Sequence, residues 1–152
     1  MKKLTILIVI LSFAGCAYSF GQISSEISII PFLNDTKFYI DQIENDYYII
    51  NKLELDLVSE GNIKSTPVKL YNNQLYKILL FGETGKILDI DLKISKKEGD
   101  NWITVKEVNN PTNVLNTEFK PDTNSFYEFE ISASKFAPGY TVGRYCLIIS
   151  YE

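Results

Sequence analysis

The stretch that most constrains the fold is Gln74–Ser95, QLYKILLFGETGKILDIDLKIS. Apolar side chains occupy both faces of Leu75–Phe81, which predicts a central strand that is covered on both sides. The residues of Leu88–Ile94 alternate between apolar and charged, which is the period of a strand with one dry and one wet face. Gly82 and Gly85 predict a tight turn between them, because glycine reaches positive φ without a Cβ clash. We interpret the stretch as a hairpin.

Similar short alternating segments recur from about residue 63 to the end of the chain, at roughly ten-residue spacing. This pattern predicts a mainly-β fold, an antiparallel, jelly-roll-like β-sandwich of about seven strands. The predicted strands are Pro67–Tyr71, Gln74–Phe81, Leu88–Ser95, Trp102–Val108, Val114–Phe119, Phe126–Ile131 and Arg144–Tyr151. A longer loop is expected over Ser132–Gly143, which holds a proline and two glycines.

One N-terminal α-helix is predicted over Thr36–Ser59. Its apolar residues recur at helical spacing, and Asn34-Asp35 before it offers a side-chain oxygen to cap the first free amides. The residues that carry the spacing are Ile40, Ile43, Tyr47, Ile50, Leu53 and Leu57. The alternative is a strand near Leu53–Leu57, which alternates cleanly, so the helix would end near Asn51.

The first 21 residues predict a signal peptide. Two lysines precede the apolar run Leu4–Ala14, which is too short to span a bilayer. Small residues allow cleavage after Ser19 or after Gly21, and we favour Gly21 because Ser-Phe-Gly-Gln resembles the signal-peptide ends common in Bacteroidetes-type bacteria. The protein is therefore expected to be periplasmic or secreted. Residues 22–152 are expected to form a single helix-plus-sandwich domain that begins with an extended lead-in, Gln22–Leu33.

The two cysteines give an alternative anchor and no disulfide. Phe13-Ala14-Gly15-Cys16 resembles a lipoprotein box, in which Cys16 would be lipidated and would attach the chain to a membrane. Cleavage after Gly21 instead removes Cys16, which leaves Cys146 without a disulfide partner in the chain. Cys146 lies in an apolar strand pattern, so we expect a buried thiol rather than a nucleophile. A nucleophile would need a base nearby, and the chain contains no histidine.

Charge and composition exclude several functions. The net charge is −4, and loss of Lys2 and Lys3 would leave 13 basic against 19 acidic residues, a net charge of −6. Binding of duplex nucleic acid requires clustered lysine and arginine, which this chain lacks. A zinc site of the usual kind requires histidine or paired cysteines. Gly82–Lys86 lacks the second half of a phosphate-binding loop. We therefore expect no enzyme activity.

Asp89 and Asp91 are the best candidates for a metal site. They lie two residues apart on one predicted strand, so their carboxylates share a face and could hold a hard cation such as Ca²⁺ together with loop carbonyls. Solubility explains an acidic outer face equally well. The pair does not suit glycosidase chemistry, because nothing raises the pKa of one carboxyl and both stay ionised. No other cofactor is expected.

Trp102 and Tyr140 are the candidate ligand-binding aromatics. Trp102 lies on the wetter side of its strand, beside Thr104 and Lys106, and exposed aromatic clusters mark binding sites. Tyr71, Tyr76 and Tyr145 could join such a sugar-stacking platform, but aromatics also fill sandwich cores. For Tyr76 and Tyr145 we expect core packing.

The order of features from Leu70 onward resembles the bacterial pre-peptidase C-terminal (PPC) type of β-sandwich domain over about half of the chain. The segments that carry the likeness are Asn73-Gln-Leu-Tyr76, which lacks the family's glycine, Asp89-Ile-Asp-Leu92, Phe119-Lys-Pro121, Tyr127 and Tyr145-Cys-Leu-Ile-Ile149. The predicted helix is not part of that pattern. The resemblance implies a secreted, non-catalytic accessory module, although members of the family mostly accompany enzymes and this chain carries none.

Together these observations predict an exported, non-catalytic module that acts through its surface. The first hypothesis is interaction with a protein partner, and the alternative is a carbohydrate-binding module that recognises a cell-surface glycan. Membrane attachment is expected only if Cys16 is lipidated.

Overall fold

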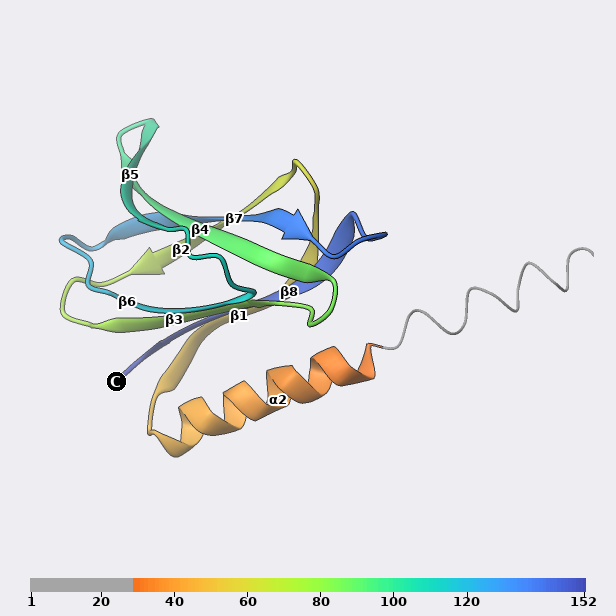
Figure 1. The fold of residues 1–152 in the computed structure, drawn as a ribbon. Coiled ribbons are helices and arrows are strands. Elements are labelled where there is room, and N and C mark those ends of the chain that lie inside the picture. Colours follow the sequence, from red (N-terminus) through yellow and green to blue (C-terminus); the bar gives the residue numbers. More distant parts are fainter. Residues whose placement is uncertain (1–28) are drawn as a thin grey trace, which may run out of the picture. The chain divides into compact units, whose positions relative to one another are not determined.

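The computed structural model describes residues 29–152, and Figure 1 shows their elements. The predicted signal peptide, the lipoprotein box and most of the predicted lead-in lie outside the described residues. The described elements are α2 (Ile30–Asn45), β1 (Ile49–Ser59), β2 (Ile63–Leu70), β3 (Tyr76–Gly82), β4 (Ile87–Glu98), β5 (Asn101–Val108), β6 (Val114–Phe119), β7 (Ser125–Phe136) and β8 (Val142–Tyr151). The chain divides into two compact units, Met1–Leu33 and Asn34–Glu152.

The eight described strands form two antiparallel sheets of four (Figure 1). Sheet A has the order β1-β8-β3-β6, and sheet B has the order β2-β7-β4-β5. This alternation between sheets, with the first strand beside the last, is the arrangement of an eight-stranded jelly roll. The predicted jelly-roll-like sandwich is therefore confirmed, and β1 is the strand that raises the predicted seven to eight.

The hydrophobic core lies between the two sheets. Tyr76 and Tyr145 are fully buried in it, as expected from the sequence. Ile87 at the start of β4 lies against the backbone of two glycines of sheet A, Gly82 and Gly143. A Cβ on either glycine would come within 2.7 Å of the Ile87 side chain. Gly82 therefore serves close packing, whereas Gly85 has the positive φ expected of a turn residue.

The predicted hairpin over Gln74–Ser95 is wrong in its pairing. β3 is hydrogen-bonded to β6 and β8 in sheet A, and β4 is hydrogen-bonded to β5 and β7 in sheet B. The chain therefore crosses from one sheet to the other between the two strands. The predicted central position of β3 is confirmed, because β3 lies between β8 and β6 and its inner side chains are buried. On its outer face Phe81 is covered by Tyr39 of α2, whereas Leu75 precedes the strand and is exposed.

The predicted helix over Thr36–Ser59 is correct only as far as Asn45. The helix starts earlier, at Ile30, so the end of the predicted lead-in is helical and Asn34-Asp35 is not its cap. Its end is closed by two backbone bonds, from Tyr48 N–H to the Ile43 carbonyl and from Tyr47 N–H to the Glu44 carbonyl, both at 3.1 Å. These bonds form a Schellman motif, in which Tyr47 takes the left-handed conformation, φ 63°, that glycine usually supplies.

The alternative strand near Leu53–Leu57 is confirmed. β1 pairs with β8 from Ile49 to Ser59, with an irregularity between Ile50 and Lys52. The ladder with β8 pairs alternate backbone groups of this segment, and the other groups point to the open edge of the sheet.

From Asn34 onward, α2 lies on the outer face of sheet A. The Tyr39 ring packs against Phe81 of β3 with a centroid distance of 4.8 Å. Cys146 of β8 is a buried free thiol, as expected. No helix among the described residues is long and apolar enough to cross a membrane.

Two further strand details differ from prediction. β7 continues to Phe136, so the first part of the predicted loop over Ser132–Gly143 is strand. The pairing of β4 with β5 skips Val105, a β-bulge that reverses the alternation after it. Trp102 and Thr104 therefore share a face, as predicted, but Lys106 does not share it and donates to the Glu118 carbonyl of β6 at 2.7 Å.

Candidate functional site

The outer face of sheet B carries the candidate site, and strand register decides which residues share it. Directly paired residues of antiparallel strands lie on the same face. Lys93 pairs with Glu130 of β7 and with Glu107 of β5, and Asp91 pairs with Ser132. The residues between them on β4, Ile90, Leu92 and Ile94, are fully buried in the core. The charged partners therefore point away from the core.

These outward side chains line a hollow of about 480 Å³. All four strands of sheet B contribute to it, β2 only through its first residue, together with the segment after β5. Its lining residues are Ile63, Asp89, Asp91, Leu92, Lys93, Glu107, Asn109, Pro111, Glu130, Ser132 and Ser134. Both predicted aspartates line this hollow. The prediction that their carboxylates share one face of the strand is therefore confirmed. The size and the convergent polar groups are those of a small-ligand site.

Two carboxylates that line the hollow differ in their contacts. Glu130 forms an ion pair with Lys93, whereas one oxygen of Asp89 has no hydrogen-bond partner among the described residues. Lys93 Nζ lies 2.5 Å from Glu130 Oε2, and this hydrogen bond raises the pKa of Lys93. Asp89 Oδ1 is buried and has no hydrogen-bond partner in the described part of the chain. A buried acceptor without a donor lowers the stability of the fold, and because solvent does not reach this oxygen, the hollow offers the accessible part of Asp89 together with Asp91 to a ligand.

The geometry does not assemble a metal centre. No group of three or more histidine, cysteine, aspartate or glutamate residues within 29–152 is placed to hold a metal ion. Ca²⁺ takes six to eight oxygen ligands, and the shared face of Asp89 and Asp91 alone does not provide them. The hypothesis of a Ca²⁺ site therefore gains no support from the fold.

Trp102 lies on the same face as the hollow. It pairs with Lys97 of β4, which is four residues along the strand from Lys93, or about 13 Å at the rise of a β-strand. Its side chain is 38% exposed. The Trp102 indole is thus exposed on the same face as the hollow, opposite a residue that lies four positions along β4 from Lys93.

Tyr140 does not lie near Trp102. It follows β7, where its N–H donates to the Ala137 carbonyl and Ala137 N–H donates to the Lys86 carbonyl at the start of β4. Trp102 is at the other end of β4, about 30 Å away at strand spacing. The Tyr140 ring lies 5.5 Å from Lys86 Nζ and is 40% exposed. The structure therefore does not join the two predicted aromatics into one platform.

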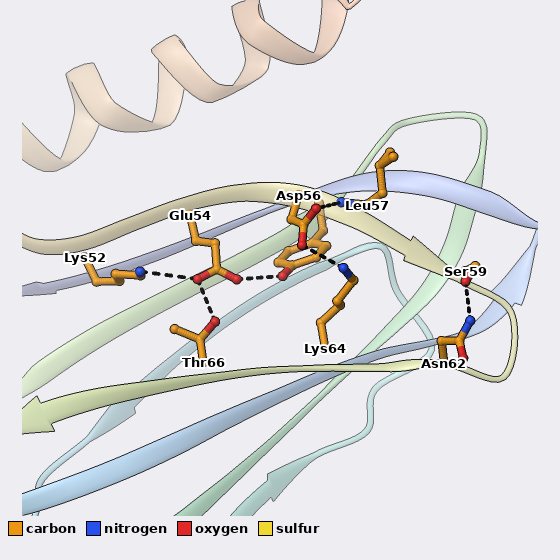
Figure 2. Close-up of polar contacts among 9 residues, drawn as sticks. Lys52, Glu54, Asp56, Leu57, Ser59, Asn62, Lys64 and Thr66 are labelled. Atoms are coloured by element: carbon orange, nitrogen blue, oxygen red, sulfur yellow. Dashed lines mark hydrogen bonds and ion pairs between the residues drawn. The ribbon is translucent and has the colours of Figure 1, made fainter.

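A second polar cluster closes the edge of the sandwich between β1 and β2 (Figure 2). Glu54 Oε1 accepts a hydrogen bond from the Tyr145 hydroxyl at 2.7 Å, and Glu54 Oε2 accepts one from Thr66 Oγ1 at 2.6 Å. Lys52 Nζ lies 3.4 Å from the same Oε2. These contacts connect β1 and β8 of sheet A to β2 of sheet B. We call Lys52, Glu54, Thr66 and Tyr145 the edge latch.

The pKa shifts in the edge latch follow from these contacts. Burial by itself raises the pKa of Glu54, but the hydrogen bonds from Thr66 and Tyr145 and the nearby Lys52 outweigh it, so the pKa lies below its ordinary value. Burial and the Glu54 carboxylate raise the pKa of Tyr145. Glu54 is thus ionised and Tyr145 is protonated, which suits a structural role.

The sequence reasoning did not find the edge latch. Its partners are far apart in the sequence: Tyr145 follows Glu54 by 91 positions. The local pattern was misleading, because alternation over Leu53–Leu57 predicts buried leucines and outward carboxylates, whereas the structure exposes the leucines and turns Glu54 toward Tyr145 and Thr66.

The opposite face of β1 is apolar and exposed. Leu53, Leu55 and Leu57 are 41%, 45% and 49% exposed. They pair with Ile148, Cys146 and Arg144 of β8 and therefore lie on the outer face of sheet A. We call these three residues the leucine stripe. Scattered exposed leucines are ordinary, but three in a row on an edge strand form a patch.

Comparisons with known proteins leave the function open. No family model matches the sequence, and no curated protein matches it significantly. Among solved structures, the Yersinia pseudotuberculosis-derived mitogen aligns with a TM-score of 0.46 and 14% identity over 69% of this chain and 87% of its own. Chitosan-binding module 1 from a chitosanase/glucanase of Paenibacillus sp. IK-5 aligns with a TM-score of 0.38 and 16% identity over 62% and 74%.

A third structure, described as a CBM4, aligns with a TM-score of 0.39 and 12% identity over 70% of this chain and 79% of its own. All three likenesses have TM-scores below 0.5, so we draw no argument about function from them.

Proposed function

We propose that this chain is an exported, non-catalytic binding module and that the outer face of sheet B binds a carbohydrate. The observation that carries the proposal is the hollow beside β4, on which polar groups from several segments converge, among them the carboxylates of Asp89 and Asp91 and the hydroxyls of Ser132 and Ser134. This proposal favours the glycan alternative over the protein partner that the sequence reasoning put first.

The lining suits a ligand that carries many hydroxyl groups. Sugar hydroxyls can donate to Asp89 and Asp91, and they can accept from Ser132, Ser134 and the Asn109 amide. Trp102, about 13 Å along the strands, offers an exposed indole on which the apolar face of a sugar ring can stack. An oligosaccharide laid along β4 would contact both, whereas a single sugar would reach only one.

The expectation of no catalysis is part of the proposal. The chain has no histidine, and burial raises the pKa of the Cys146 thiol to about 12, although Thr36 opposes this by a hydrogen bond. Cys146 is therefore not a nucleophile at neutral pH. Export and the role of a PPC-like accessory module also remain predictions from the sequence.

Glycan-array screening followed by calorimetric titration of the bound oligosaccharide tests this function. Loss of a carboxylate in Asp91→Asn and loss of the indole in Trp102→Ala are each expected to weaken binding by about fivefold or more, since each removes an interaction worth about 1 kcal/mol or more. Phe38→Ala is the matched control, because this aromatic is also exposed but lies on α2, which covers the other sheet. An array without any bound glycan, or equal losses in all three variants, would reject the proposal.

A protein partner is the second candidate function, and the leucine stripe favours it. An exposed apolar row beside unpaired backbone groups is a surface on which proteins add a strand. Leu55→Lys is expected to abolish such binding while leaving glycan binding unchanged. A variant that retains its protein partner despite this change would remove the stripe from consideration.

A further inference from the structure

β1 is an edge strand whose outer backbone groups are free to pair. In sheet A it is hydrogen-bonded only to β8. Leu57 N–H points away from β8 and donates locally to the Asp56 carboxylate Oδ1 at 2.8 Å. Backbone groups alternate in direction along a strand, so those of Leu53 and Leu55 also point to the open edge. The leucine stripe therefore borders a row of unpaired donors and acceptors.

The sequence of this edge is self-complementary. From Leu55 outward, each direction gives first an acidic residue, Glu54 or Asp56, and then a leucine, Leu53 or Leu57. An isologous dimer requires a surface that fits a copy of itself after a half-turn, and an antiparallel strand with a symmetric pattern has this property. A surface evolved for an unlike partner carries no such requirement.

We infer that β1 pairs with β1 of a second copy, so that two A sheets join edge to edge about a two-fold axis at Leu55. In this register Leu55 faces its own copy, and Leu53 faces the partner's Leu57. The edge-directed N–H and C=O groups of these residues then close the ladder, and the six leucines form one apolar strip across the junction. The inference does not depend on the glycan proposal, because it uses the other sheet.

Charges on the opposite face of β1 do not prevent this pairing. Glu54 would lie opposite the partner's Asp56, and like charges in that position are destabilising when they are bare. Here Asp56 Oδ2 lies 2.9 Å from Lys64 Nζ, and Glu54 belongs to the edge latch with Lys52 (Figure 2). Each carboxylate is thus already neutralised within its own chain. Pairing only requires Asp56 Oδ1 to release Leu57 N–H to the partner strand.

The other edge strand of comparable exposure is less suited to a regular ladder. β5 exposes Trp102, Ile103 and Val105, but the bulge at Val105 interrupts its alternation. Bulges are one of the features that keep edge strands from pairing. Among the described edges, this contrast makes β5 the internal control for β1.

Sedimentation velocity of the purified chain over a range of concentrations tests the dimer. The unmodified chain is expected to sediment as a concentration-dependent dimer. Leu55→Lys places two ammonium groups against each other at the axis and is expected to weaken association by about 100-fold or more. Ile103→Lys, at a site that is 46% exposed on β5, is expected to leave it unchanged. A monomer at every concentration, or a dimer that Leu55→Lys does not affect, overturns the inference.

Cysteine cross-linking tests the register in the mature chain, where the remaining native thiol, Cys146, is buried. Leu55→Cys is expected to form a disulfide-linked dimer on mild oxidation, because directly opposed residues have Cα atoms within the range that a disulfide spans. Leu53→Cys lies about four residues, or about 13 Å, from its own copy and is expected not to cross-link. Equal cross-linking at both positions, or cross-linking at Leu53 alone, contradicts the two-fold at Leu55.

Discussion

Replacing Tyr145 by phenylalanine removes one oxygen from the edge latch and nothing else. The ring stays in the core, so no cavity forms, and the change isolates the hydrogen bond to Glu54. A hydrogen bond to a charged acceptor contributes about 1.5–3 kcal/mol to stability. Glu54 keeps Thr66 and Lys52, and its side chain is 18% exposed, so water can replace part of the loss. We expect a decrease of about 1.5–2 kcal/mol in the free energy of unfolding.

Glu54→Ala should cost more than Tyr145→Phe. It leaves two buried hydroxyls, on Tyr145 and Thr66, without an acceptor, and each such orphan costs about 1–3 kcal/mol. The double variant Glu54→Ala/Tyr145→Phe removes both partners and should lose less than the sum of the two single changes, with a coupling of about 1–2 kcal/mol. Urea unfolding followed by circular dichroism near neutral pH measures all of these differences, provided that the m-values agree.

Tyr140→Phe is the matched control, because the Tyr140 hydroxyl makes no hydrogen bond in the described residues. It is expected to change stability by less than about 0.5 kcal/mol. If Tyr145→Phe were equally neutral, or if the double variant were additive, the edge latch would not hold the two sheets together.

The pH dependence of the edge latch has a definite sign. The pKa of Glu54 is lowered from 4.5 in the folded protein, so its stabilising contribution is complete above the unfolded value and is lost as the pH falls through the folded pKa. Between neutral pH and about pH 3, the stability of the unmodified chain should therefore fall more steeply than that of Glu54→Gln. Parallel curves for the two proteins would contradict the assignment.

Three further predictions follow from the packing. Gly143→Ala should destabilise the fold by about 1–3 kcal/mol through its clash with Ile87, and thermal melts should show Ile87→Ala costing less in that background than alone. Tyr47→Gly should stabilise by about 0.5–1 kcal/mol, because it relieves a left-handed residue at the end of α2; a lower melting temperature would contradict this. Cys146 should resist a thiol reagent at about pH 8 until denaturant is added, and rapid native labelling would refute its burial.

The strands were predictable from the sequence because alternation reports which face of a strand is buried. It does not report which strand lies alongside. Gln74–Ser95 shows this limit. Both of its strands are predicted correctly, but the short connection between them suggests a hairpin, whereas the two strands belong to different sheets. In the structure β8 and β6 already occupy the two edges of β3, so β4 must belong to the other sheet. That information lies in residues far along the chain.

The end of the helix was misjudged for a local reason. Ile50, Leu53 and Leu57 fit a helical period and Leu53, Leu55 and Leu57 fit a strand period, so the pattern alone could not decide between them. Pairing with β8 decides for a strand. The stop at Tyr47 was also hidden, because the left-handed position carries tyrosine where glycine is the usual signal.

The candidate site was half visible in the sequence. Asp89 and Asp91 could be placed on one face because they share a strand. Glu130, Ser132 and Asn109 could not be added, because they come from other segments and reach the hollow only through the register of β7 and β5. Trp102 was correctly expected to be exposed, but its distance from Tyr140 depends on the length of β4, which the sequence did not fix.

The most direct test of the glycan-binding face is an NMR titration of the ¹⁵N-labelled chain with the oligosaccharide that binds best on the array. We predict that amide shifts change along the outward residues of sheet B, from Asp89 and Ser132 in the hollow toward Trp102, while β1 and α2 stay unchanged. Saturable changes confined to β1, or no saturable change anywhere, would contradict the assignment of this face.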